Sequence, residues 1–351
     1  SSNIVEQLNE EENGTEIKLL EWNATAAVNL LPLFNPKNPD MVLKSQVTIS
    51  QYQVDKFNGW FTPSTYGSNV NDGVTGKASR DFDKSTTNNL EWVTNFSTRI
   101  KNHQIRAMVG YSYNYGVNSG MSAENWNFSS DGLTYNNLGS GLEAAKDGKT
   151  MMGSYKNDHK LISFFGRVNY DWKERYLFTF SLRHEGSSRF GENHKWGNFP
   201  AVSAGWRISS EPFYDIPAIS NMKVRIGWGQ NGNSDIPAYS TIDSYMSNPN
   251  HSNYPIDGSQ SSVTTGYTQT RYGNANLKWE TTTQTNVGLD LGFLDNSLTV
   301  VLDWFNKDTK DLLWERPLIG TVGGTNQTVW DNVGKMRNRG FEAEVSYNKS
   351  I

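Results

Sequence analysis

Residues 161–208 constrain the fold more than any other stretch of the chain, because their side chains alternate between two chemical classes. On the first expected strand one face is apolar and aromatic, formed by Ile162, Phe164, Val168, Tyr170 and Trp172. The other face is polar or charged, formed by Ser163, Arg167, Asn169 and Asp171. The next strand opposes Tyr176, Phe178, Phe180 and Leu182 to Thr179, Ser181, Arg183 and Glu185. Successive side chains of a strand point to opposite faces, and a transmembrane β-barrel needs one lipid-facing and one wet face.

Alternation and turn residues predict eleven strands along the chain. We place them at residues 16–31, 43–54, 90–101, 104–115, 160–172, 176–186, 199–208, 222–230, 278–293, 297–307 and 339–349. Tight turns are expected at 102–103, 173–175 and 294–296, medium connections at 187–198 and 209–221, and long ones at 55–89, 116–159, 231–277 and 308–338. Shorter and longer connections alternate, as in outer-membrane barrels with short periplasmic turns and long extracellular loops.

The expected fold class is therefore all-β, a transmembrane antiparallel β-barrel. Single-chain bacterial barrels usually have an even number of strands, and barrels with plugged lumens have about 22. An open half sheet would leave unpaired backbone groups in lipid. We therefore expect residues 1–351 to form about half of such a barrel, with a plug domain before Ser1 and the closing strands after Ile351.

Composition excludes several other classes of protein. The 32 basic and 36 acidic residues form no basic stripe, so nucleic acid is not an expected partner. The mean hydropathy of −0.64 is that of a soluble protein, but barrels also give such averages because lipid-facing and lumen-facing residues alternate. The chain has no cysteine and therefore no disulfide or thiolate metal site.

Three ordered blocks of residues carry a family resemblance. The first includes Phe165–Tyr170, Glu174–Leu177, Gly186–Gly191 and Trp196–Trp206, the second Asn276–Thr282 with Asn286–Asp290, and the third Asn332–Glu342. Together they resemble SusC/RagA-type TonB-dependent outer-membrane transporters. His184-Glu185 departs from the pattern, since the family more often has Arg-Asp there.

The resemblance implies a multi-pass protein of a Gram-negative outer membrane that imports a large nutrient, an oligosaccharide or a peptide, and is not an enzyme. It also implies a SusD-like surface lipoprotein as a partner, outer-membrane lipid around the barrel, TonB as the energy source through a missing N-terminal region, and no cofactor. Two alternatives remain open on the residues alone. One is an outer-membrane barrel with another role, such as an adhesin or a porin, and the other is a soluble carbohydrate-binding β-protein.

Charged residues on the polar faces of the expected strands are the candidates for the lumen wall. They are Arg167, Arg183, Glu185, Lys223, Arg225, Asp290, Asp303, Glu342 and Glu344. Glu342 and Glu344 share a face as paired catalytic carboxylates might, but no apolar pocket is indicated near them. The five histidines form no metal-binding pattern.

Aromatic residues fall into two sets. Those near strand ends on the apolar faces are expected at the membrane interface: Tyr111, Tyr113, Trp172, Tyr176, Trp206, Trp228, Trp304 and Tyr347. Others lie in the long connections, where they could stack on sugar rings or pack the loops together. From this second set we select Trp126, Tyr245 and Trp330 as candidates for contact with substrate or with a lipoprotein lid.

Overall fold

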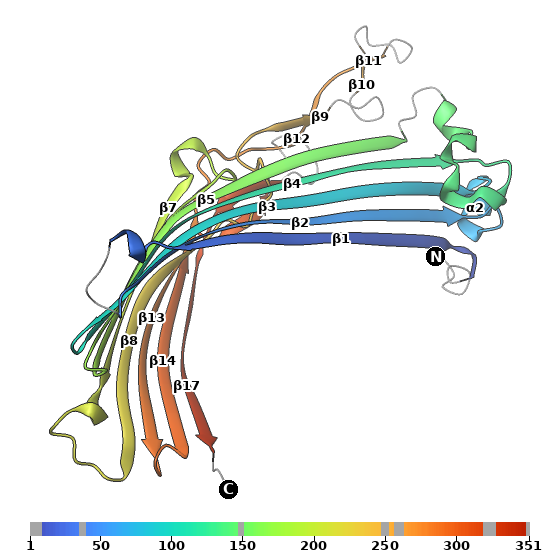
Figure 1. Ribbon diagram of the computed structural model, residues 1–351. Helices are drawn as coiled ribbons and strands as arrows, with labels where there is room; N and C mark the ends of the chain where they lie inside the picture. Colours follow the sequence, from blue (N-terminus) through green and yellow to red (C-terminus); the bar gives the residue numbers. More distant parts are fainter. Residues whose placement is uncertain are drawn as a thin grey trace.

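The chain forms one strongly curved antiparallel sheet of eleven strands (Figure 1). The computed structural model describes residues 9–34, 40–146, 151–246, 253–255, 263–318 and 328–348. The sheet strands follow the order of the sequence: β1 (Glu12–Asn29), β2 (Val42–Thr62), β3 (Lys77–Ile100), β4 (His103–Trp126), β5 (Met152–Trp172), β6 (Tyr176–Ser187), β7 (Trp196–Arg207), β8 (Ile219–Asn233), β13 (Glu280–Phe293), β14 (Leu298–Lys310) and β17 (Lys335–Tyr347). Neighbours in the sheet are thus joined by hairpin connections.

Short elements occupy the connections. They include three small hairpins built from β9 (Ser244–Met246) with β12 (Thr268–Arg271), β10 (Asn253–Pro255) with β11 (Val263–Thr265), and β15 (Leu313–Pro317) with β16 (Thr328–Asn332). The helices are α2 (Gly67–Asp72), η1 (Leu31–Leu33), η2 (Asp131–Asn136), η3 (Leu138–Ser140), η4 (Glu143–Ala145), η5 (Glu192–His194) and η6 (Ile208–Ser210). No helix in the described ranges is both long and apolar enough to cross a membrane.

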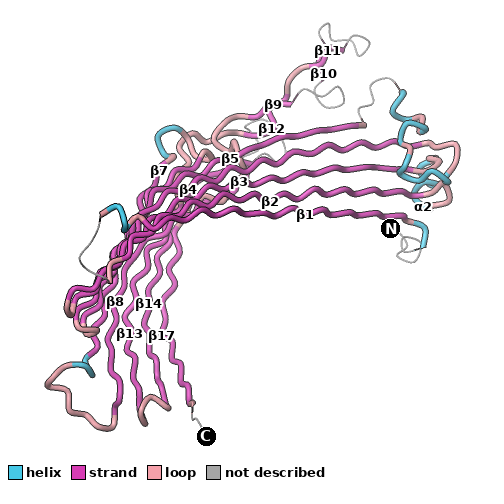
Figure 2. The backbone as a smooth tube through the Cα atoms, viewed as in Figure 1, coloured by secondary structure: helices cyan, strands magenta, loops and turns pink. Residues whose placement is uncertain are grey.

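The predicted number of sheet strands is confirmed, but the predicted lengths of two connections are wrong. Residues 55–62 and 77–89, expected in a loop, belong to β2 and β3, and the connection between them is only residues 63–76. The connection expected at 116–159 likewise shrinks to 127–151. In these strand ends charged side chains share a face with aromatic ones, as Asp55 does with Phe57 and Lys84 with Phe82, so the alternation that marks the central parts of the strands breaks down. Figure 2 shows how far β2–β5 run as uninterrupted strands.

Strand β6 inverts the usual relation between polarity and exposure. Its exposed residues are the apolar ones, Tyr176, Phe178, Phe180 and Leu182. The intervening Leu177, Thr179, Ser181 and Arg183 are half-buried. A water-soluble sheet buries its apolar face, so this pattern indicates that the exposed face meets lipid.

Two cross-strand rows of aromatic side chains bound the apolar band. In the row next to the short turns, Trp172 stacks on Tyr176 at 5.4 Å between ring centroids, and Tyr176 on Trp206 at 6.4 Å. In the second row, Tyr111 meets Phe164 at 5.2 Å. Phe164 and Trp172 are eight residues apart on β5, which is about 26 Å along the strand and about 20 Å of membrane thickness at a tilt of ~40°. This spacing covers most of an apolar band of ~25 Å.

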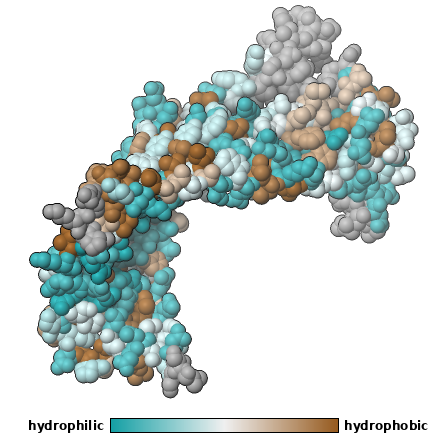
Figure 3. All heavy atoms as spheres, in the orientation of Figure 1, coloured by the Kyte–Doolittle hydropathy of each residue, from teal (hydrophilic) through white to brown (hydrophobic). Residues whose placement is uncertain are grey.

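The two halves of the sheet differ in the hydropathy of their visible surfaces. In Figure 3 the leg formed by β8, β13, β14 and β17 shows a largely hydrophilic face, whereas hydrophobic patches follow the arch over β1–β5. Strand β4 continues for fifteen residues beyond Tyr111, about 50 Å along the strand. The strands at this end therefore extend well past the aromatic row.

Arginine substitutions at neighbouring positions of β6 test which face meets lipid. We expect Phe180→Arg, between the two aromatic rows, to lower the free energy of unfolding by about 2–4 kcal/mol, because the charge would lie in the apolar band. Ser181→Arg, on the opposite face, should change it by less than about 0.5 kcal/mol. Denaturant titration in lipid vesicles measures both. Equal effects of the two substitutions would contradict the assignment of faces.

Candidate functional site

The register of the sheet assigns all nine predicted wall residues to one face, as the five on β5, β6, β13, β14 and β17 illustrate. Directly paired residues share a face: Arg167 pairs with Ser181 across β5 and β6, and Asp303 pairs with Glu342 across β14 and β17. Followed from strand to strand, these pairings put Arg167, Arg183, Asp290, Asp303 and Glu342 on what we call the polar face. They put Phe164, Phe178, Leu289 and Val300 on the opposite, apolar face.

An ion-pair network crosses three strands of the polar face. The guanidinium of Arg225 on β8 donates to Asp290 on β13, with Nε–Oδ1 at 2.9 Å and Nη2–Oδ1 at 2.8 Å. The same Nη2 donates to Oδ2 of Asp303 on β14 at 3.1 Å. One cation thus bridges two carboxylates, and the fork of the guanidinium fixes their geometry.

Gly288 makes this network possible. It lies between Arg225 and Asp303 in the register, on the middle strand β13. A Cβ atom at this position would lie 2.5 Å from Oδ1 of Asp303 and 2.7 Å from Cζ of Arg225. Because glycine has no side chain, there is space for Arg225 to reach across β13 to Asp303 on β14. Alternation alone could not reveal this role, since glycine carries no polarity signal.

A second polar cluster surrounds Glu185, within the stretch where the sequence departs from the family pattern that it resembles. Ser163 Oγ donates to Glu185 Oε1 at 2.5 Å, and Arg183 Nη2 donates to the same oxygen at 2.7 Å. Ser163 and Glu185 are both buried. His184 lies on the apolar face and stacks on Trp196 at 4.6 Å. A glutamate can therefore hold this buried hydrogen-bonded position, while the histidine joins the aromatic row.

The three resemblance blocks, far apart in sequence, meet at the end of the sheet that carries the long connections. Phe190 of the first block and Leu277 and Trp279 of the second are buried together with Phe199 and Ile236, and we call this cluster the loop core. Trp279 stands 5.1 Å from Phe190 between ring centroids and donates from Nε1 to the carbonyl of Lys195 at 3.0 Å.

The third block joins the same assembly through the backbone. Asn332 Oδ1 accepts from the backbone N–H of Lys278, and Asn332 Nδ2 donates to the Lys278 carbonyl, both at 2.9 Å. Asn274 Nδ2 donates to the carbonyl of Trp330 at 3.1 Å. The connections 188–195, 234–279 and 311–334 are thus tied together in their described parts. The three motifs, which combine apolar and amide side chains and are flanked by polar residues, can be recognised in the sequence. Their meeting in space cannot.

The three aromatic candidates occupy different places. Trp330 lies in β16 and packs, partly buried, against the loop core. Trp126 ends β4, where Nζ of Lys77 lies 5.1 Å from its ring centroid. Tyr245 lies in β9 with 60% of its side chain exposed. In Figure 1 the end of β4 lies beside α2, well away from β9, so the structure does not gather the three into one site.

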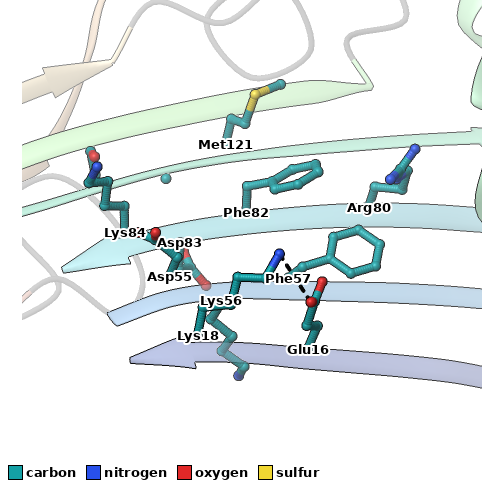
Figure 4. A pocket seen from close by; sticks show the side chains of 12 residues that line it. Glu16, Lys18, Asp55, Lys56, Phe57, Arg80, Phe82, Asp83, Lys84 and Met121 are labelled. Carbon is teal, nitrogen blue, oxygen red and sulfur yellow. Dashed lines mark ion pairs between the residues drawn. The ribbon is translucent and has the colours of Figure 1, made fainter. Parts of the chain in front are cut away.

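A groove of the described residues lies on the apolar face, not the polar one. It has a volume of about 610 Å³ and lies over β1–β4, beyond the aromatic rows. Figure 4 shows its lining, in which the Arg80 guanidinium lies beside the rings of Phe57 and Phe82, at 4.9 and 5.6 Å from their centroids. Charged residues return to the apolar face here, in Glu16, Lys18, Asp55, Arg80 and Lys84. Such charges are expected where the strands have left the membrane.

Among the described residues, the fold brings together no group of side chains suited to catalysis or to metal binding. In the described part of the chain, no three His, Asp or Glu side chains are placed to hold a metal ion. Glu342 and Glu344 lie on β17 at the edge of the sheet, and both are exposed. An exposed carboxylate pair lacks the enclosed pocket of a catalytic pair.

Comparisons with known proteins agree with this geometry. Residues 21–348 match a family model described as TonB dependent receptor-like, beta-barrel. The TonB-dependent receptor P3 of Formosa agariphila is 34% identical over 292 residues, 82% of this chain and 27% of that protein. The TonB-dependent receptor SusC of Bacteroides thetaiotaomicron is 37% identical over 196 residues, 55% of this chain and 19% of that protein.

The fold has a solved counterpart. A chain of the RagAB peptide importer in its closed-closed state superposes with a TM-score of 0.79 at 22% identity, over 96% of this chain and 34% of that one. The expected SusC/RagA-type resemblance and the β-barrel fold are confirmed. The chain spans 19% to 34% of the length of these relatives.

Two glycines of the polar face offer a matched test of the Arg225 network. Gly288→Ala should lower the free energy of unfolding by about 1–3 kcal/mol, because its Cβ would displace Arg225 or Asp303. Gly227→Ala should change it by less than about 0.5 kcal/mol, since the nearest atom to its Cβ would be Ser203 Cβ at 3.9 Å. Denaturant titration compares the two, and a Gly288→Ala protein as stable as Gly227→Ala would refute the role of Gly288.

Leucine truncations test the loop core. Leu277→Ala removes a side chain that is 0% exposed and should destabilise the connections by about 2–5 kcal/mol. We expect proteolysis within residues 234–279 and 311–334 to accelerate together. Leu142→Ala, at 65% exposure in another connection, is the control and should leave cleavage rates unchanged. Acceleration in only one of the two connections would mean that the core does not join them.

Proposed function

The chain belongs to the TonB-dependent receptor-like β-barrel family, and from that premise we propose that it forms part of the wall of an outer-membrane transporter that imports a large polar nutrient. An oligosaccharide is the proposed substrate class. A peptide is the second candidate, because the similar RagAB chain belongs to a peptide importer. The different chemistry of the two faces is the observation that carries the proposal. An exposed apolar face suits lipid, and a charged face with an ion-pair network suits a wet interior.

The proposed passage runs along the polar face. Arg167, Arg183, Asp290, Asp303 and Glu342 would then line the lumen. Clusters such as Arg225 with Asp290 and Asp303 keep the wall polar while engaging its charges in ion pairs. A wall whose charges are engaged with one another lets hydroxyl-rich or peptide chains slide past without holding them by strong charge pairs.

The proposed partners follow from the family. A SusD-like lipoprotein would cover the end with the long connections, and TonB would act through a plug domain outside residues 1–351. Trp126, Tyr245 and Trp330 remain candidates for contact with substrate or lid. The packing of Trp330 on the loop core favours a structural role for this residue as well. The closing strands of the barrel would pair with the free edges of β1 and β17.

The alternatives predict different behaviour. An adhesin or passive porin would need no lipoprotein and no energy source. A soluble carbohydrate-binding protein would leave cells without detergent, although the exposed Phe178, Phe180 and Leu182 argue against it.

Labelling of intact cells tests orientation and partner together. We expect surface protease to cut within residues 63–76, 127–151, 234–279 or 311–334, and impermeant amine reagents to leave Lys173 unlabelled, because it lies in a turn at the opposite end of the strands. Labelling of Lys173 on intact cells would contradict the proposed orientation.

Purification of the complete protein in mild detergent should bring a lipoprotein with it. Repeated isolation of the transporter alone would contradict the proposed lipoprotein lid.

A further inference from the structure

A hollow of about 340 Å³ opens on the apolar face, beside the aromatic row next to the short turns. Its lining comes from β5, β6, β7 and β8, which lie inside the sheet and not at its edges. The walls of the hollow therefore do not depend on strands beyond β1 or β17. Its volume lies within the range of about 300–1,000 Å³ that is usual for small-molecule sites.

Ala204 creates the hollow, because it is the one small side chain in a row of large ones. Across β5–β8 the register pairs Tyr170 with Phe178, Phe178 with Ala204 and Ala204 with Ile226. On the side of the short turns, Trp206 lies two residues along β7 on the same face and also lines the hollow. The methyl group of Ala204 thus forms the floor of a notch between the rings of Phe178 and Trp206 and the branched side chain of Ile226.

The hollow offers hydrocarbon contacts and little else. The polar tips of its three amphipathic aromatic residues are already engaged. The Tyr170 hydroxyl lies 2.8 Å from Nδ1 of His103, Trp206 Nε1 donates to Glu211 at 3.0 Å, and the Tyr176 hydroxyl is also hydrogen-bonded to Glu211. The hollow opens on the face that we assign to lipid, between the two aromatic rows. A flexible hydrocarbon chain is therefore the occupant that its chemistry and its place on the sheet both indicate.

A cation stands where the headgroup of such a lipid would lie. Nζ of Lys173, in the turn after β5, lies over the ring of Trp172 at 5.2 Å from its centroid. Trp172 belongs to the apolar face and stacks on Tyr176, which lines the hollow. The nearby Glu211 is buried and accepts hydrogen bonds of its own. Glu174, in the same turn as Lys173, is exposed, so a headgroup that carries both a phosphate and an ammonium group would match this edge.

We propose that the hollow binds one acyl chain of a phospholipid from the leaflet next to the short turns, with the lipid phosphate held by Lys173. The site goes beyond nutrient import, since it concerns the contact of the wall with its membrane. Van der Waals packing, and not the hydrophobic effect, drives association inside a bilayer. The notch at Ala204 lets a chain touch four strands at once, which a flat strand surface does not. The ammonium of Lys173 adds attraction for the phosphate.

Native mass spectrometry of the complete transporter in detergent, titrated with a phosphatidylethanolamine, tests the proposal. We expect one lipid molecule to stay bound after detergent exchange. Ala204→Leu would fill the notch and should lower the affinity at least about tenfold. The matched control is Ala107→Leu, on the apolar face of β4 between Phe96 and Val168 and outside the hollow. It should leave lipid binding unchanged, and both variants should unfold at the temperature of the unmodified protein.

A second variant separates the headgroup contact from the chain contact. Lys173→Gln should weaken the binding of phosphatidylethanolamine about fivefold and leave that of a diacylglycerol with the same chains unchanged, whereas Ala204→Leu should weaken both. Equal lipid binding by Ala204→Leu and Ala107→Leu, or an unchanged affinity in Lys173→Gln, would overturn the proposal. A second copy of the chain over the hollow would overturn it as well, and would appear as a dimer that Ala204→Leu dissociates without loss of lipid.

Discussion

The continuous antiparallel register is the constraint on which the rest of the structure depends. Each strand from β1 to β14 pairs with its successor in the sheet residue for residue, and within these ladders the one shift lies at Gly292 and Phe293, at the end of β13. A slip of one residue in any pair would turn every later side chain to the wrong face. The separation of apolar and polar side chains onto two faces over eleven strands therefore depends on the backbone hydrogen bonding.

Some side chains of the polar face cross a neighbouring strand at a glycine of that strand. Tyr155 passes over Gly120 to donate to Asp83 at 2.8 Å, as Arg225 passes over Gly288 to Asp303. Such crossings connect strands that share no backbone hydrogen bonds, so they can resist shear between neighbouring hairpins.

The sequence was sufficient for the faces and the strand count, because alternation is a local signal. Phe178 and Ser181 could be assigned to opposite faces from residues 176–187 alone. It was insufficient where both faces meet water, as in residues 77–89, since alternation then carries no polarity. It was also insufficient for contacts between distant strands. The reach of Arg225 over Gly288 and the meeting of Phe190 with Leu277 depend on the three-dimensional register, which no short window contains. Neither the sequence nor the fold assigns a role to Trp126 and Tyr245, because such a role depends on a ligand or partner.

The loop core has a consequence for how proteins of this family can diversify. Phe190 and Leu277 come from separate connections and share one buried cluster, and the amide of Asn332 from a third connection is hydrogen-bonded to the backbone of Lys278 beside it. A loop exchanged alone between two members of the family would arrive without its packing partners. New specificities are therefore more readily acquired by recombining all three connections as a block, or by changing residues that project from the core while the core itself is retained.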